Sequence, residues 1–218
     1  FVNGNILETD AKTAEMCKLA ENSFRDLNIA FANELSMICV KQDIDVWNLI
    51  KLANQHPRVN ILQPGTGVGG HCIAVDPWFI VSQYKEEAKL IRAAREVNNY
   101  KTKWVIDKIK RNADNYISKN GIKPKIVCLG LAFKPDIDDL RESKALEVVE
   151  TLLKDGYDIC AVEPNIKSHK NVPLYNLLDT IGNVDIIYIL VKHREFLNPE
   201  IKKKLIKFKA IDFCGALS

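Results

Sequence analysis

A single cysteine follows a glycine-rich run near the middle of the chain. Four of the six residues 65–70 are glycine, and Cys72 comes two positions later. Glycine lets the backbone approach a ligand closely, so such a run serves either a tight turn or an anionic group. Asp76 and Pro77 predict a helix start just behind the cysteine, with Asp76 as the N-cap. A thiol at the positive end of a helix is a usable nucleophile, although a plain turn beside a buried cysteine fits the pattern equally well.

Three polar residues share one face of the first predicted helix. Apolar spacing over residues 14–38 predicts a long helix that is capped by Asp10. Lys18 and Asn22 stand four residues apart, and Arg25 follows three residues later, so helical spacing places all three on one stripe. The stripe is either a solvated helix edge or a set of polar groups in the wall of a site.

Two further segments lead into and out of the glycine run. Residues 46–54 predict a helix capped by Asp43 or Asp45, and prolines in the loop after it exclude a strand or a helix there. Arg58 in that loop is either a surface charge or an anion contact. After Pro77 a helical pattern continues to Gly121, as one helix or two, and a segment of this length often spans two domains or forms a dimer seam.

The second half of the chain alternates strand and helix patterns. Strands are predicted at 125–132, 158–162, 185–191 and 209–213, and helices at 143–154 and 199–208. This alternation predicts a parallel sheet with helices on its faces. We therefore expect an α/β protein with a helical domain at 1–118 and a Rossmann-like domain at 119–218. Ligands bind beyond the carboxyl ends of parallel strands. The residues expected at that edge are Phe133, Lys134, Asp136, Arg141 and Glu163.

The first turn of this sheet lacks the GxGxxG pattern of dinucleotide-binding folds. Gly130-Leu-Ala-Phe-Lys134 takes its place, so a dinucleotide pyrophosphate is not the expected ligand at this turn. A nucleotide diphosphate neutralised by Lys134 fits the turn. So does the simpler interpretation that Lys134 and Arg141 pair with neighbouring aspartates.

Composition narrows the class of protein. The 218 residues include 31 Lys and Arg against 28 Asp and Glu, for a formal charge of +3, which argues against nucleic-acid binding. No apolar run has the roughly 20 residues that cross a bilayer, so no membrane partner is expected. The six cysteines show no CxxC pair. We therefore expect no metal site and reduced thiols, as in a cytoplasmic protein.

Three separated motifs carry a family resemblance. They are Glu15-Met-Cys-Lys-Leu-Ala-Glu-Asn22, Gly67-Val-Gly-Gly-His-Cys72 with Asp76, and Gly130-Leu-Ala-Phe-Lys-Pro-Asp136 with Leu140-Arg-Glu-Ser143. In order and spacing they resemble the UDP-glucose/GDP-mannose dehydrogenase family over nearly the whole chain. Within it, Phe24-Arg-Asp-Leu-Asn28, Asn54-Gln-His-Pro-Arg-Val-Asn60 and the histidine before Cys72 are most similar to members that oxidise UDP-N-acetyl-D-mannosamine.

The resemblance implies a four-electron oxidation of a sugar C6 alcohol to a carboxylate, with NAD⁺ as the oxidant. Cys72 would add to the aldehyde as a thiohemiacetal, which is oxidised to a thioester and hydrolysed. Lys18 would stabilise the oxyanion or move a proton, Asn22 would hold the same oxygen or a water, and Asp76 would position water.

The same resemblance assigns the binding residues. Those expected on the UDP-sugar are Arg25, His56, Arg58, Gly69, Phe133 and Lys134, with Arg58 reaching in from a neighbouring subunit. Arg141 would contact NAD. Many relatives have a basic residue where this chain has Cys214, which puts a substrate contact there in question.

The resemblance covers the central and UDP-binding domains and leaves out the N-terminal NAD domain. We therefore expect a fragment that binds UDP-sugar without turning over NAD⁺, and a homodimer formed through the central helices. Two alternatives remain: specificity for UDP-glucose, and a non-catalytic UDP-binding dimerisation module.

Overall fold

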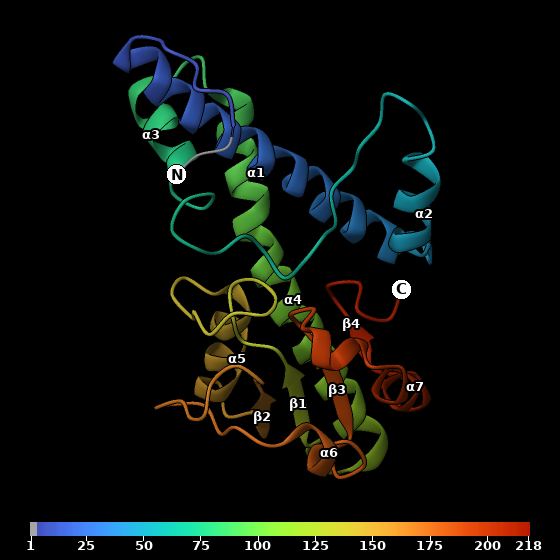
Figure 1. Cartoon of the computed structure of the whole chain (residues 1–218). Helices are drawn as coiled ribbons and strands as arrows, with labels where there is room; N and C mark the ends of the chain where they lie inside the picture. The colour runs from blue at the N-terminus through green and yellow to red at the C-terminus, as the bar shows by residue number, and fades with distance from the viewer. Residues whose placement is uncertain (1–3) are drawn as a thin grey trace.

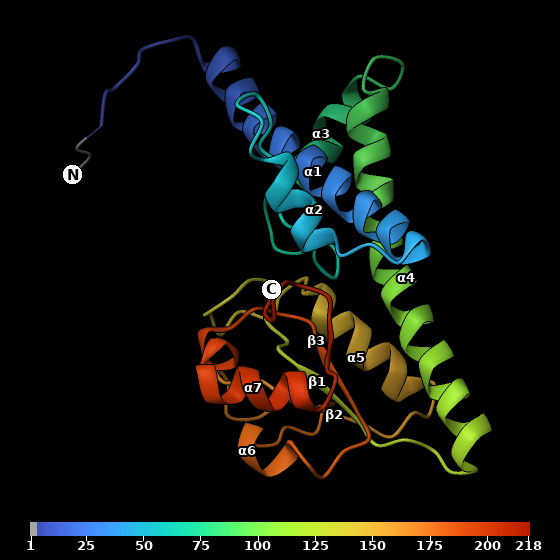
Figure 2. The same ribbon diagram turned by 90° about the vertical axis from the view of Figure 1, so that its right-hand side faces the viewer.

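A long helix joins a helical part to a sheet part. The computed structural model describes residues 4–218 (Figure 1). The helical part contains α1 (Ala11–Gln42), α2 (Val46–Ala53) and α3 (Asp76–Gln83), and α4 (Lys89–Asn120) runs from it down to the sheet. Figure 2 shows the same two parts from the side, with α4 alongside both. The boundary expected near residue 118 therefore lies in the last turn of α4.

The predicted caps fix the ends of the first helices. The Asp10 carboxylate accepts a hydrogen bond from the Thr13 backbone N–H at 3.0 Å and begins α1. Asp43 ends α1 in the left-handed conformation, with φ 54°. The capping side chain of α2 is therefore Asp45, which accepts from Trp47 N at 2.9 Å.

The helical pattern behind Pro77 forms two helices. The helix α3 ends at Gln83, and α4 begins after Ala88 and ends before its C-cap Gly121, whose φ of 73° is left-handed. The prediction that Asp76 is an N-cap was wrong. Asp76 lies in the first turn of α3, and its carboxylate accepts a hydrogen bond from Asn22 of α1.

The second half forms the predicted parallel sheet. Its strands are β1 (Ile126–Leu129), β2 (Ile159–Val162), β3 (Ile186–Ile189) and β4 (Ile211–Asp212), in the order β2-β1-β3-β4. All pairings are parallel, which confirms the α/β fold class. The helices around it are α5 (Lys144–Lys154), α6 (Leu177–Thr180), the 3₁₀ helix η1 (Arg194–Leu197) and α7 (Pro199–Lys207). The helical patterns at 143–154 and 199–208 predicted α5 and α7, whereas no pattern predicted α6 or η1.

Alternation along the strands builds two apolar layers. Ile126 and Cys128 of β1 point to the layer under α4 and α5, whereas Val127 and Leu129 point to the layer under α7. Because α4 supplies Val105, Ile109 and Ala113 to the first layer, the second half of α4 is packed onto the sheet.

A buried polar network joins α1 to α4. Arg95 contacts Asp26 at 2.6 Å, and Asn98 donates to the same carboxylate at 2.7 Å. Asn33 donates to Asn98 at 2.9 Å and accepts from the backbone N–H of Gly65 at 2.9 Å. The network therefore ends on the first glycine of the glycine-rich run and fixes where that run begins.

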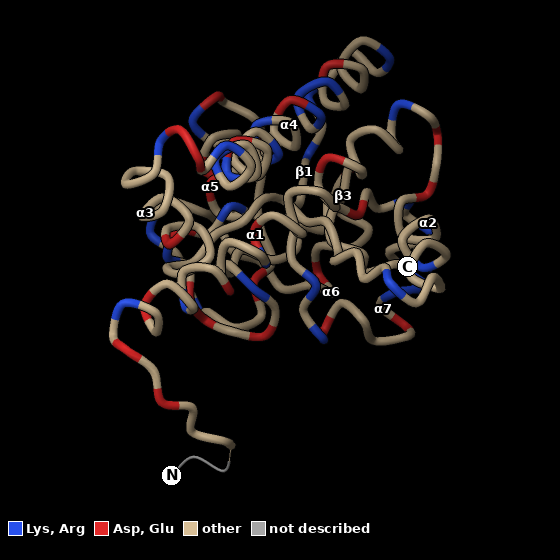
Figure 3. The backbone as a smooth tube through the Cα atoms, turned by 90° about the horizontal axis from the view of Figure 1, so that it is seen from above, with Lys and Arg blue, Asp and Glu red and all other residues tan. Residues whose placement is uncertain are grey.

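The surface carries mixed charge. Figure 3 shows basic and acidic residues interspersed along the elements of both parts. Within residues 4–218, none of the helices combines the length and apolar character needed to cross a membrane.

Candidate active site

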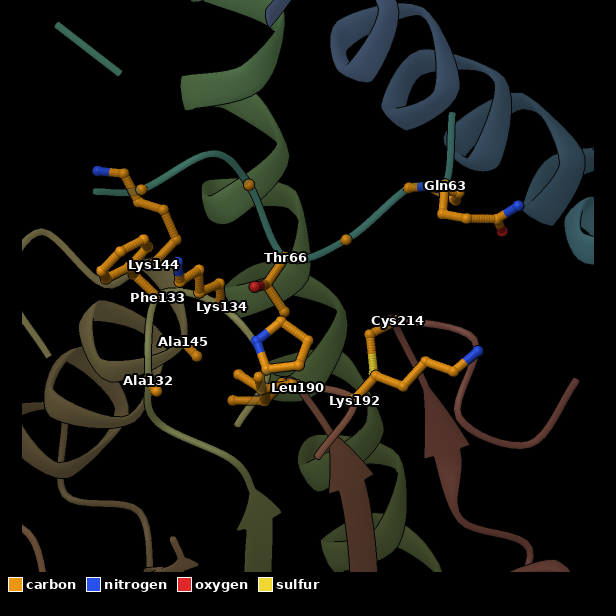
Figure 4. Close-up of a pocket in the computed structure, with 16 residues that line it drawn as sticks. Gln63, Thr66, Ala132, Phe133, Lys134, Lys144, Ala145, Leu190, Lys192 and Cys214 are labelled. Atoms are coloured by element: carbon orange, nitrogen blue, oxygen red, sulfur yellow. The ribbon is translucent and has the colours of Figure 1, made fainter. Parts of the chain in front are cut away.

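A cavity of about 270 Å³ lies between the glycine-rich run and the carboxyl ends of β1 and β3. Figure 4 shows the run passing over these strand ends, with Ala132, Leu190 and Cys214 below it. The lining residues are Gln63–Gly67, Gly69, Ala132–Pro135, Lys144, Ala145, Leu190–Lys192 and Cys214. The cavity therefore brings together three of the expected binding residues, Gly69, Phe133 and Lys134.

Two glycines bring the run close to the sheet part. A Cβ on Gly69 would collide with the backbone carbonyl of Glu142. A Cβ on Gly70 would lie 2.9 Å from the Phe133 ring, and Gly70 has a φ of 85°. The glycines are therefore needed first for contact between two segments of this chain, and the cavity forms where those segments diverge.

Three of the expected catalytic residues, Cys72, Asp76 and Asn22, are connected by hydrogen bonds. The carbonyl of Cys72 accepts hydrogen bonds from Val75 N at 3.0 Å and Asp76 N at 2.8 Å, which folds the thiol-bearing turn onto the start of α3. Asn22 donates to the Asp76 carboxylate at 2.5 Å. The Cys72 side chain is exposed, as a nucleophile for a large substrate must be.

Lys18 lies one helical turn before Asn22 on α1. Its side chain is exposed and pairs with Glu21 at 3.5 Å. A surface pair of this kind is weak, so the ammonium is free to exchange Glu21 for another anion. The stripe predicted for Lys18, Asn22 and Arg25 is thus a buried Asn22 flanked by two exposed cations.

Phe133 and Lys134 lie on the loop after β1, which buried side chains hold in place. The Phe133 ring meets His71 edge to face at 5.9 Å, and the Lys134 ammonium lies 5.6 Å from the Phe133 centroid. His71 directly precedes the cysteine, so this aromatic contact couples the Cys72 turn to the sheet part.

The loop is held by Glu163, for which the sequence predicted a ligand contact. Its carboxylate is buried and accepts from Leu131 N at 2.6 Å and Ala132 N at 3.0 Å. Its other oxygen accepts from the backbone and side chain of Asn165. All of these donors belong to the chain itself, so the Glu163 carboxylate holds the loop in place. The prediction that Glu163 contacts a ligand was therefore wrong.

His193, which sequence analysis missed, completes the support. Its Nε2 contacts Glu163 at 3.0 Å, and its Nδ1 accepts from the backbone N–H of Asp136 at 2.9 Å. Burial raises the pKa of Glu163, but the hydrogen bonds from His193, Leu131 N and Asn165 N outweigh it and lower that pKa to about 2. The signal in the sequence was a histidine just past the end of a predicted strand.

Arg141 stands apart from the cavity. It forms a bidentate pair with Asp139, with Nη2 at 2.7 Å and Nε at 3.0 Å, and His71 contacts the same carboxylate at 3.4 Å. The Arg141 hydrogen bonds hold the pKa of Asp139 well below its usual range. For Arg141 the simpler interpretation from the sequence, pairing with a neighbouring aspartate, is what the structure shows.

Two expected binding residues lie away from the cavity within this chain. His56 and Arg58 are exposed on the loop behind α2, where His56 Nδ1 accepts from Arg58 N at 3.2 Å. Neither they nor Arg25 belong to the cavity lining. The cavity therefore brings in none of His56, Arg58 and Arg25.

Lys144 and Lys192 line the cavity although sequence analysis singled out neither. Lys192 follows the end of β3, so the same strand-end rule that selected Lys134 could have found it. Lys144 pairs with Glu147 at 2.7 Å. With Lys134, they make the cavity rim basic.

The described residues do not fit the main site of a dinucleotide. The backbone N–H groups of Leu131 and Ala132, which a pyrophosphate would use at the first turn, donate to Glu163 instead.

One group of side chains could in principle hold a metal ion. Asp136, His193 and Glu195 offer ligand atoms within 4.8 Å of one another, but both ring nitrogens of His193 already have partners within the chain.

Comparison with known proteins identifies both parts of the chain. Residues 12–100 match the central domain of the UDP-glucose/GDP-mannose dehydrogenase family, and residues 127–217 match its UDP binding domain. A UDP-N-acetyl-D-mannosamine dehydrogenase from Campylobacter jejuni is 55% identical over 98% of this chain and 52% of its own length. An NDP-N-acetyl-D-galactosaminuronic acid dehydrogenase from Ralstonia solanacearum is 54% identical over 90% of this chain and 46% of its own.

Solved structures show the same fold. A UDP-N-acetyl-mannosamine dehydrogenase from Staphylococcus aureus has a TM-score of 0.76 at 44% identity, over 91% of this chain and 45% of that one. A UDP-D-ManNAc dehydrogenase from Pyrococcus horikoshii has a TM-score of 0.82 at 35% identity, over 100% of this chain and 52% of that one. The chain spans about half the length of the curated relatives that it matches. Both of its domains, and the motifs that link them, show that the chain belongs to the UDP-glucose/GDP-mannose dehydrogenase family.

Proposed function

We propose that this chain supplies the nucleophile and the nucleotide-sugar site of an NAD-dependent UDP-N-acetyl-D-mannosamine 6-dehydrogenase. The observation that carries the proposal is the cavity between the glycine-rich run and the strand ends, which is basic at its rim and is lined by Gly69, three positions before the exposed Cys72. A UDP group in this cavity would meet Lys134 and Phe133, and its sugar would extend toward the thiol.

The chain's own residues account for the covalent steps. The Cys72 thiolate adds to the C6 aldehyde, and the Lys18 ammonium stabilises the oxyanion of the resulting thiohemiacetal. Asn22, held by Asp76, donates to the same oxygen or orders a water, and that water hydrolyses the thioester formed by the second oxidation. NAD⁺ would accept the hydrides, and residues outside this chain must form its main site.

The relatives favour an N-acetylated sugar over UDP-glucose. Relatives named as UDP-N-acetyl-D-mannosamine dehydrogenases are 52–55% identical to this chain, and one named for N-acetyl-D-galactosaminuronic acid is 54% identical. We therefore rank UDP-N-acetyl-D-mannosamine first.

The state of the cysteines bears on the compartment. The six cysteines of the described residues are all free of disulfides, which suits an enzyme of the cytoplasm.

An exposed stripe on α1 supports the homodimer. Phe24, Phe31 and Ile38 follow one another at seven-residue spacing and are 69%, 53% and 51% exposed. An exposed apolar stripe with this seven-residue spacing suits the seam between two paired helices. A second copy would cover it and would also bring a second Arg58 loop to the assembly. Sedimentation of the Phe31→Glu variant as a monomer, against a dimeric parent chain, would support this seam.

Calorimetric titration with UDP-sugars tests the substrate proposal. The chain should bind UDP-N-acetyl-D-mannosamine more tightly than UDP-glucose, and Lys134→Met should weaken binding about tenfold or more. In the enzyme that carries an NAD domain, Cys72→Ser should abolish carboxylate formation. Tight UDP binding together with an unaffected Cys72→Ser enzyme would instead favour the non-catalytic module, and equal binding of both sugars would remove the N-acetyl preference.

A further inference from the structure

The chain buries a lysine that has no carboxylate partner among residues 4–218. Lys101 of α4 is 2% exposed, and its ammonium donates to the Ser36 hydroxyl at 2.6 Å and lies 4.4 Å from the Trp104 ring centroid. An ammonium has three donors, and a buried charge is normally paired. Ser36 takes one of them, so the described residues leave the charge of Lys101 without a counter-ion.

A second lysine adds to this charge. Lys108 lies two helical turns further along α4, and its ammonium stands 5.2 Å from the same Trp104 ring. Burial, and then the nearby Lys108, lower the pKa of Lys101 to about 7. Two cations on one aromatic ring make this a place where an outside anion would be stabilised.

The two lysines line a cavity that is separate from the candidate active site. It measures about 170 Å³ and is lined by residues of α1, α2, α4 and β4 and of the loops beside them. Val40, Val46 and Phe213 give it apolar walls, and Pro64 borders both cavities.

The acidic residues in its wall are already engaged. Asp45 accepts from the backbone of Trp47 at 2.9 Å. Asp212 accepts from Cys214 N and Gly215 N at 2.9 Å and from Leu217 N at 2.8 Å. Within residues 4–218 neither carboxylate forms an ion pair with Lys101 or Lys108, so neither is the direct partner of the Lys101 ammonium.

We propose that this second cavity binds a small organic carboxylate, with its anionic end on Lys101 and Lys108 and its apolar end against Trp104 and Phe213. A carboxylate fits better than phosphate because the cavity offers two ammonium groups and no arginine fork. A phosphate dianion loses more hydration on burial than a monoanion. The inference does not depend on the activity proposed above.

Thermal unfolding of the chain with simple probes tests the ligand class. Propionate and isobutyrate at constant ionic strength should raise the melting temperature in a concentration-dependent way, because a ligand that binds only the folded chain stabilises it. Propionamide, which has the same shape without the charge, should have no effect. Inorganic phosphate should act more weakly than propionate. A melting temperature that ignores carboxylates, or that responds equally to propionamide, would overturn the proposal.

Matched variants locate the effect. Lys101→Met should lower the propionate affinity at least tenfold, whereas Lys103→Met, at an exposed position on the same helix, should leave it unchanged. Lys108→Met, at a partly buried position, should lower it too, so the proposal stays testable if the Lys101 variant does not fold. Propionate binding that survives both the Lys101 and the Lys108 changes would show that it binds elsewhere and would refute the site.

Discussion

Replacing Glu163 with glutamine should destabilise the sheet part and remove a defined part of its acid sensitivity. The Glu163 carboxylate accepts hydrogen bonds from Leu131 N, Ala132 N, His193 and both nitrogens of Asn165. The carbonyl oxygen of glutamine can replace only one carboxylate oxygen, and its amide group would face N–H donors on the other side. Buried donors left without acceptors cost about 1–3 kcal/mol each. We expect a loss of roughly 2–4 kcal/mol at pH 7.

The lowered pKa of Glu163, which the same hydrogen bonds cause, gives a second magnitude. A carboxyl whose pKa is 4.5 in the unfolded chain and about 2 in the folded chain contributes about 3 kcal/mol at neutral pH. Because the folded pKa is the lower one, this stability is complete above about pH 5 and is lost as the pH falls toward 2. At pH 3 roughly half of it should remain.

Urea unfolding at pH 7 and pH 3, followed by far-ultraviolet circular dichroism, measures both values. Glu195→Gln, an exposed glutamate near the same strand ends, is the control and should change stability by less than about 0.5 kcal/mol. The difference between the parent chain and Glu163→Gln should shrink by about half between pH 7 and pH 3. Equal stability of the two variants at pH 7, or a difference that does not depend on pH, would refute the role assigned to Glu163.

Three further changes probe the support of the candidate site. Gly70→Ala places a methyl group 2.9 Å from the Phe133 ring at a φ of 85°, so calorimetry should show UDP affinity reduced about tenfold or more. Asn33→Ala leaves Gly65 N and Asn98 without their partner and should cost about 2–4 kcal/mol in urea unfolding; an unchanged midpoint would contradict the network. Arg141→Ala breaks an exposed pair and should leave stability within about 1 kcal/mol.

Local patterns predicted most of the fold. Asp10 caps α1, and Asp45, one of the two predicted candidates, caps α2, because in each case a short side-chain oxygen reaches a free N–H within three residues. The alternation of strands and helices along the chain predicted the parallel sheet. The four-residue α6 and the 3₁₀ helix η1 carry too few positions for a periodic signal.

Contacts between distant segments limited the prediction of the site. Glu163 was expected to meet a ligand because it follows a strand, but the neighbouring β1 turn and His193 on the far side of β1 occupy it. Asp76 was expected to cap its own helix, but Asn22, 54 positions earlier, binds its carboxylate. Lys101 gave no signal at all, because a lysine on a helix normally lies in solvent.

The central claim is that a UDP-sugar in the cavity under the glycine-rich run reaches Cys72. Alkylation by iodoacetamide, read by peptide mass spectrometry with and without saturating UDP-N-acetyl-D-mannosamine, tests it directly. Cys17, the other exposed cysteine of the described residues, serves as an internal control. We predict that the sugar nucleotide slows labelling of Cys72 about tenfold and leaves Cys17 unchanged. Equal labelling of Cys72 in the presence of demonstrably bound ligand would contradict the claim.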